Sequence, residues 1–282
     1  MFQLKRQEAV VMARFSILVT SDLSDRSERA LRRAFKLAGS MDAELTLFSV
    51  ADESLPTDLC DLLASRSQEY LEAFAKEAGN NSKPKIIVER GDPTTRLAEM
   101  ANNPAFDLVI FGRHRTGRFF DGFRKTTLES VASLALNPLL IVVNPSHQDY
   151  RRVLAPTAFS RACHRAVETA IKVAPDAELR MIHAWNAPFE GLTGGKDSSY
   201  AKTIAKETKD LAEDWSTNLP ADLSPVDLIH GGIGPAVAEL VNSWQPELLA
   251  IGAHTRSLSI SGLGSFTSEL LRDPPTDLLI TR

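Results

Sequence analysis

The feature that most constrains this 282-residue chain is an internal duplication. Residues 17–24 (ILVTSDLS) return 136 positions later as residues 153–160 (VLAPTAFS), and residues 43–48 (AELTLF) return as residues 177–182 (AELRMI). Three more apolar segments return in the same order: 86–91 as 226–231, 107–112 as 247–252, and 139–143 as 278–281. A repeat at this long spacing indicates two copies of one structural unit, not one large domain.

Each copy alternates short apolar strands with amphipathic helices. Ser24 and Ser160 follow the first strand of their copies, where a helix N-cap is expected. We expect Gly39 and Pro175 to end the helices that begin there. Alternation of this kind predicts a parallel sheet with helices on both faces, and the unbroken apolar strands fit burial on both sides. The predicted fold is therefore α/β, with two Rossmann-like, five-stranded parallel-sheet domains in tandem.

The repeats also suggest where the units begin and end. We expect an N-terminal tail over residues 1–13, a first domain over residues 14–147 and a second over residues 148–282. The tail repeats nothing later in the chain, and Met1 and Met12 are both candidates for the translation start. The boundary falls in a polar stretch that ends at Tyr150.

Composition excludes several classes of protein. A net charge of −4 and a pI near 5.9 give no basic face for nucleic acid. No run of 18 apolar residues suggests a membrane span. The two cysteines, Cys60 and Cys163, lie far apart without metal-ligand spacing, which favours a reducing, cytoplasmic location and predicts no metal site.

The chemistry is expected where ligands enter such folds, beyond the carboxyl ends of the strands at the point where strand order reverses. In the second copy the loop after the fourth strand, residues 252–265, reads GAHTRSLSISGLGS. A helix is predicted to begin at about Phe266, so Gly264 and Ser265 would present backbone N–H groups at its N-terminus. This arrangement favours an anionic ligand.

That loop resembles the Gly-x2-Gly-x9-Gly-Ser/Thr phosphate loop of ATP-binding universal stress proteins. Pro156 and Thr157 are similar to that family's adenine-side loop, and Asp22 fits its Asp-x-Ser motif in the first copy. The resemblance covers residues 15–282 and implies the adenine nucleotide alpha hydrolase-like fold, a regulatory and non-enzymatic role, and ATP with Mg in the second domain. The implied binding residues are Pro156, Thr157, Gly252, His254, Thr255, Gly264, Ser265, Phe266 and Asp22.

Both copies depart from the family pattern. In the second, Thr255 replaces a glycine, the spacer before Gly264 is one residue short, and Ala158 replaces the acidic residue. The first keeps Asp22, but Lys125 takes the place of the last glycine. The first loop also carries a basic cluster: Arg113, Arg115, Arg118, Arg124 and Lys125. Two interpretations stay open for the second copy, a nucleotide site or a simple helix cap.

Weaker signals concern enzymes and assembly. Residues 193–198 (TGGKDS) resemble the loop of ATP pyrophosphatases, but they follow the second strand instead of the first, so we expect a solvent-exposed insertion. His114 and His254 have no recognisable catalytic partner. The favoured hypothesis is a stress-associated protein that binds an adenine nucleotide in domain 2, and the alternative is a nucleotide-free scaffold or oligomerisation module. Related single units dimerise, so the copies are expected to form an intramolecular pseudo-dimer, with a homodimer of chains as a further possibility.

Overall fold

The computed structural model describes residues 14–78, 83–113, 127–145, 149–189, 195, 198–253 and 263–282. The first half contains β1 (Ser16–Thr20), α1 (Asp25–Met41), β2 (Glu44–Asp52), α2 (Thr57–Ala78), β3 (Lys85–Gly91), α3 (Pro93–Ala101), β4 (Leu108–Gly112), α4 (Thr127–Leu134) and β5 (Leu139–Val142). The second half contains β6 (Arg152–Pro156), α5 (Arg161–Val173), β7 (Glu178–Trp185), α6 (Ser199–Ser216), β8 (Asp227–His230), α7 (Ile233–Ser243), β9 (Leu248–Gly252), α8 (Ser265–Arg272) and β10 (Asp277–Thr281). The predicted tail lies outside the described residues.

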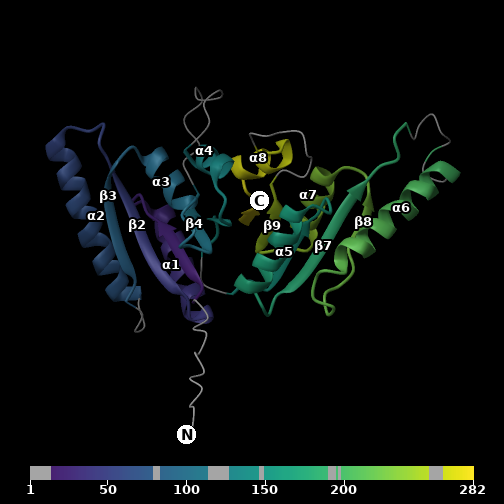
Figure 1. Cartoon of the computed structure of the whole chain (residues 1–282), viewed down its shortest axis with the longest axis horizontal. Coiled ribbons are helices and arrows are strands. Elements are labelled where there is room, and N and C mark those ends of the chain that lie inside the picture. The colour runs from purple at the N-terminus through teal and green to yellow at the C-terminus, as the bar shows by residue number, and fades with distance from the viewer. Residues whose placement is uncertain are drawn as a thin grey trace, which may run out of the picture.

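The strands form one ten-stranded sheet in the order β3-β2-β1-β4-β5-β10-β9-β6-β7-β8. Within each half all strands are parallel, which confirms the predicted pair of five-stranded Rossmann-like units. The halves meet where β5 pairs antiparallel with its counterpart β10, with Leu140 opposite Leu279. Figure 1 shows the two halves side by side about this central junction. The two fifth strands thus form the central contact between the halves within a single chain.

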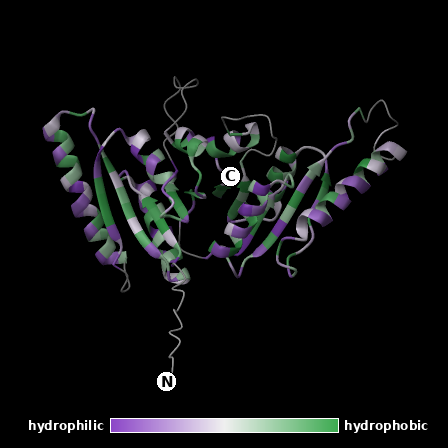
Figure 2. Cartoon of the chain, in the orientation of Figure 1, coloured by the Kyte–Doolittle hydropathy of each residue, from purple (hydrophilic) through white to green (hydrophobic). Residues whose placement is uncertain are grey.

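Each face of the sheet carries its own apolar core. On one face, alternate strand residues such as Ile17 and Val19 pack against α1, α2 and α5. On the other face, residues such as Leu18 pack against α3, α4, α7 and α8. The central strands β4, β5, β9 and β10 are therefore apolar along nearly their whole length, as sequence analysis predicted, whereas the outer strands β3 and β8 carry charged residues at their ends. The helices are apolar on one side only (Figure 2).

The first helix of each half begins as predicted. The side chain of Ser24 accepts a hydrogen bond from Ser27 N, and that of Ser160 accepts one from Cys163 N. The predicted stop at Gly39 is wrong, because α1 continues to Met41 and ends where Asp42 adopts a left-handed conformation with φ of 48°. An added Cβ at Gly39 would meet open space, so this glycine neither strains nor interrupts the helix.

A buried polar cluster joins the halves beside the β5–β10 pair. Asp277 is fully buried and accepts hydrogen bonds from Val143 N (2.8 Å), Asn144 N (2.9 Å) and Tyr150 Oη (2.6 Å). The guanidinium of Arg33 lies 3.6 Å from the same carboxylate and 4.1 Å from the centre of the Tyr150 ring. Burial raises the pKa of Asp277, and burial together with the adjacent Asp277 raises the pKa of Tyr150 well above its usual value. Tyr150 therefore remains a neutral hydrogen-bond donor to Asp277.

Candidate functional site

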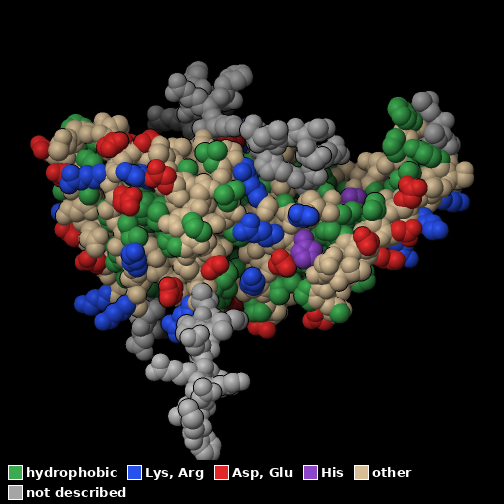
Figure 3. All heavy atoms as spheres, in the orientation of Figure 1, with side chains coloured by type: hydrophobic (Ala, Val, Ile, Leu, Met, Phe, Trp, Pro, Cys, Tyr) green, Lys and Arg blue, Asp and Glu red, His purple; other side chains and the backbone are tan. Residues whose placement is uncertain are grey.

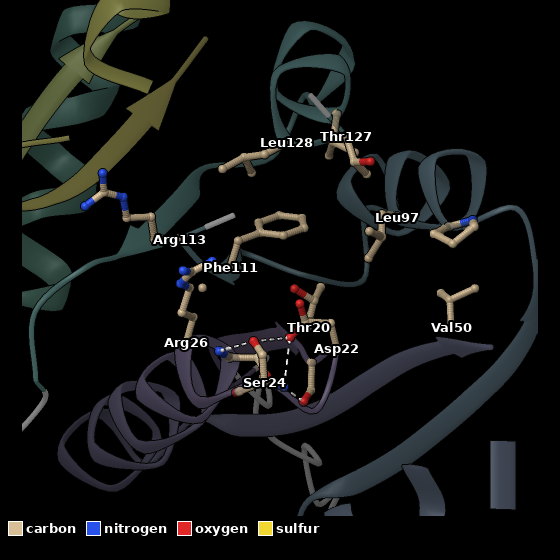
Figure 4. A pocket seen from close by; sticks show the side chains of 15 residues that line it. Thr20, Asp22, Ser24, Arg26, Val50, Leu97, Phe111, Arg113, Thr127 and Leu128 are labelled. Atoms are coloured by element: carbon tan, nitrogen blue, oxygen red, sulfur yellow. Dashed lines mark hydrogen bonds between the residues drawn. The ribbon is translucent and has the colours of Figure 1, made fainter. Parts of the chain in front are cut away.

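A cavity of about 190 Å³ lies in the first half at the carboxyl ends of β1 and β4, the strands between which the chain order reverses. This is the position at which ligands enter doubly wound sheets. Figure 4 shows the apolar side chains of Phe111 and Leu97 facing each other across it, with Asp22 on the side of β1. The wall is formed by Thr20, Ser21, Asp22, Ser24, Arg26, Ser27, Val50, Pro93, Leu97, Phe111, Gly112, Arg113, Thr127, Leu128 and Val131.

Asp22 is held in a tight local turn at the edge of this cavity. Its Oδ1 accepts hydrogen bonds from Ser24 N (3.1 Å) and Ser24 Oγ (2.5 Å). Partial burial raises the pKa of Asp22, but hydrogen bonds from Ser24 and Ser27 outweigh burial and hold this pKa below its usual value. The carboxylate is thus ionised at neutral pH, and it can accept hydrogen bonds from hydroxyl groups of a ligand.

The residue after this position has an unusual backbone in both halves. Leu23 has φ of 62° and its repeat counterpart Phe159 has φ of 59°. Left-handed backbone in a bulky residue costs about 1–2 kcal/mol, so the surrounding structure must enforce it. The ring of Phe159 stacks on His183, with centroids 4.2 Å apart, and contacts Trp215. A left-handed residue therefore recurs at the same place after the first strand of each half.

Gly112 and Gly252 have a packing role that sequence analysis did not foresee. A Cβ on Gly112 would lie 2.6 Å from the carbonyl oxygen of Arg26, and a Cβ on Gly252 would lie 2.4 Å from Cys163 N. Each glycine ends the fourth strand of its half and lets that strand touch the first turn of α1 or α5. Packing between the fourth strand and this helix therefore requires glycine at both positions, whether or not a ligand also approaches them.

The predicted residues of the second half lie at the ends of β6 and β9, at the start of α8, or outside the described residues. Pro156 ends β6, and Thr157 Oγ1 accepts a hydrogen bond from Phe159 N (3.0 Å) while the Thr157 carbonyl oxygen lies 2.8 Å from His183 Nδ1. Gly252 lies at the end of the neighbouring strand β9. His254 and Thr255 lie outside the described residues.

The remaining predicted residues lie at the start of α8. Gly264 is the N-cap residue, Ser265 begins the helix, and Phe266 packs against the core shared by α7 and α8. An added Cβ on Gly264 would meet no described atom within 4 Å, and its φ of −59° suits any residue. Neither backbone strain nor described packing therefore requires glycine there, in contrast to Gly252.

The nine predicted residues do not form one site. Asp22 belongs to the first-half crevice, and the others belong to the second half. The apolar wall made by Val50, Leu97 and Phe111 was missed, although each lies at or beside the end of a predicted strand or in the following helix. Its only sequence signal is that these apolar residues lie at the carboxyl edge of the predicted sheet.

One member of the basic cluster can be placed. Arg113 follows β4, lines the cavity and forms an ion pair with Asp273 of the second half, with Nη2 and Oδ1 2.7 Å apart. A second ion pair crosses the same junction, because Arg272 of α8 lies 2.7 Å from Glu129 of α4. The other four members, Arg115, Arg118, Arg124 and Lys125, lie outside the described residues, as does His114.

Other sequence signals have structural explanations. Ser198, the last residue of the pyrophosphatase-like segment, caps α6 by accepting a hydrogen bond from Ala201 N. Within the described part of the chain, no group of His, Cys, Asp and Glu side chains could hold a metal ion, and no helix has the length and apolarity needed to cross a membrane. On the face seen in Figure 3, acidic and basic side chains are interspersed.

Comparison with known proteins agrees with the duplicated architecture. The model of the universal stress protein family matches twice, over residues 14–143 and 149–282. The chain belongs to the universal stress protein family. A universal stress protein of Methanocaldococcus jannaschii is 30% identical over 147 residues, which cover 47% of this chain and 84% of that protein.

Solved structures show the same tandem universal stress protein fold. A universal stress protein from Archaeoglobus fulgidus superposes with a TM-score of 0.70 at 17% identity, covering 95% of this chain and 98% of that one. A putative universal stress protein from Pseudomonas aeruginosa gives a TM-score of 0.65 at 16% identity, covering 95% and 93%. At these identities the likeness supports the fold alone.

Proposed function

We propose that this universal stress protein is a cytoplasmic, non-enzymatic regulatory protein that binds an adenine nucleotide in a crevice at the carboxyl edge of its sheet. The observation that carries the proposal is the first-half cavity. Its apolar wall suits the flat face of a base, and Asp22 is placed to accept hydrogen bonds from sugar hydroxyls. Among the described residues no nucleophile, base and supporting carboxylate come together at this cavity, which supports binding without turnover.

The second-half crevice is the site that the sequence favoured. Gly264 supports it, because nothing described in the fold requires a glycine at the N-terminus of α8, whereas close approach of a phosphate would. ATP with Mg, the cofactor that the family resemblance implies, is proposed for this half. Ala158 in place of the acidic residue weakens the case, since the second half then lacks the counterpart of Asp22.

Thermal unfolding with AMP, ADP or ATP at millimolar concentration tests the proposal. A ligand at 100 times its dissociation constant adds about 2.7 kcal/mol to the free energy of unfolding, so binding would raise the melting temperature measurably. Nucleotide released from the purified protein on denaturation would support the same conclusion. No shift with any nucleotide would favour the alternative, a nucleotide-free scaffold.

Variants separate the two crevices. Asp22→Ala should remove the shift if the first half binds, and Asp25→Ala, an exposed acidic residue in the first turn of α1, is its charge-matched control. Gly264→Lys should remove the shift if the second half binds, because it reproduces Lys125 of the first half. Gly39→Lys is the control for that substitution, since Gly39 also faces open space.

A further inference from the structure

The cavity of the first half contains an arginine that is held by the second half. Arg113 is fixed at its backbone, because its N–H donates to the carbonyl oxygen of Val142 (3.0 Å) at the end of β5. In Figure 4 its guanidinium points away from Asp22 and toward the second half, where Asp273 binds it. The side chain is 39% exposed and that of Asp273 is 83% exposed, so water reaches this ion pair.

An ion pair so exposed is easily exchanged for another. Water and salt screen it, and it contributes little to stability. A phosphate or carboxylate group inside the cavity would offer the planar guanidinium two oxygens in a less exposed position, which is the stronger arrangement. Asp22 repels a negative group on its own side of the cavity, so charge directs that group toward the side of Arg113.

We propose that Arg113 recognises the anionic group of a ligand in the first-half cavity, and that Asp273 of the second half competes with the ligand for it. The inference rests on the proposed nucleotide function and assigns the residue that distinguishes a nucleotide from a nucleoside. Asp273 acts as a built-in competitor that lowers the affinity for the anionic ligand.

The competition links the two crevices. Asp273 directly follows α8, the helix that begins at Ser265 after its N-cap Gly264, two residues of the proposed second-half site. A ligand that takes Arg113 from Asp273 therefore removes one of the two described ion pairs between the halves at α8, and the Glu129–Arg272 pair remains. By thermodynamic reciprocity, whatever strengthens the Arg113–Asp273 pair must weaken binding of the anion.

Isothermal titration of the full chain with adenosine and with AMP tests the inference. We expect Asp273→Asn to bind AMP about two- to fivefold more tightly than the wild type, with adenosine unchanged. Arg113→Ala should bind AMP about tenfold more weakly, again with adenosine unchanged, and Arg113→Lys should recover part of the loss. Asp42→Asn is the matched control, because it removes one exposed carboxylate from an ion pair with Arg14 far from the cavity.

Each outcome decides something different. If the wild type binds adenosine and AMP equally, or if Arg113→Ala keeps the preference for AMP, Arg113 does not recognise the anion while the proposed function stands. An unchanged AMP affinity in Asp273→Asn overturns the competition. If the wild type binds neither compound, the proposed first-half site fails and the inference with it.

Discussion

The buried Asp277 cluster allows a quantitative prediction about how the two halves are held together. Replacing Asp277 with Ala removes the acceptor of three hydrogen bonds and the carboxylate 3.6 Å from the buried guanidinium of Arg33. Breaking a buried ion pair by removing one partner costs about 3–5 kcal/mol, because the remaining charge stays desolvated. For a protein of this size the melting temperature should fall by roughly 6–20 °C.

A second variant separates the charge from a single hydrogen bond. Tyr150→Phe removes the 2.6 Å bond to Asp277 and keeps the ring beneath Arg33, so we expect a loss of about 1.5–3 kcal/mol. Urea unfolding followed by far-ultraviolet circular dichroism gives both free energies. Tryptophan fluorescence reports on the second half, since Trp185, Trp215 and Trp244 all lie there, and coincident transitions would show that the halves unfold together.

An Asp277→Ala protein within about 1 kcal/mol of the wild type would show that the buried ion pair does not stabilise the junction. A Tyr150→Phe protein that loses as much stability as Asp277→Ala would show that the hydrogen bond, and not the buried charge, dominates. Ala gives a cleaner comparison than Asn here, since an amide nitrogen would face the guanidinium of Arg33.

Three further predictions follow from single residues. Burial raises the folded-state pKa of Asp277 above the ordinary value of 3.8. As pH rises from 3.8 to the folded-state pKa, the free energy of unfolding of the wild type should therefore fall relative to that of Asp277→Asn, and urea titrations across that pH window measure the slope. A wild-type free energy of unfolding that rises relative to that of Asp277→Asn would contradict a raised pKa. Gly252→Ala should cost at least about 1–3 kcal/mol, because its Cβ would lie 2.4 Å from Cys163 N, whereas Gly264→Ala should cost under about 1 kcal/mol in the same melts. Leu23→Asn should stabilise the protein by about 0.5–1 kcal/mol, because Asn tolerates the φ of 62° better; an unchanged melting temperature would mean that the turn relaxes without strain.

Local sequence patterns predicted local structure well. The caps at Ser24 and Ser160 depend only on the following three residues. The strands were predicted from short apolar runs, and each run recurs at the equivalent place in the second copy. The duplication then doubled the support for each element. The family resemblance led us to expect an intramolecular pseudo-dimer, but the sequence did not indicate which strands would make the contact, and the structure shows that these are β5 and β10 in antiparallel pairing.

Long-range features could not be predicted in the same way. Tyr150 appeared in a polar boundary stretch, yet it is buried against Asp277, which lies 127 positions away in the sequence. Gly252 was assigned to a ligand loop, although its closest constraint is the backbone of α5. Both depend on how packed elements meet, and a pattern within one segment contains no information about its distant partner.

The Asp277 cluster has a consequence for how such a chain can evolve. In a dimer of identical subunits, every substitution at the twofold interface appears twice, so a buried aspartate would bring a second one to the symmetry-related place. Here the repeat counterparts of Asp277 and Arg33 are Pro138 and Thr169, and neither is ionisable. Joining the two units in one chain has removed the requirement for self-complementarity. The chain can therefore carry this carboxylate–guanidinium contact once, with each partner on one half only, whereas a symmetric pair of single units would carry it twice.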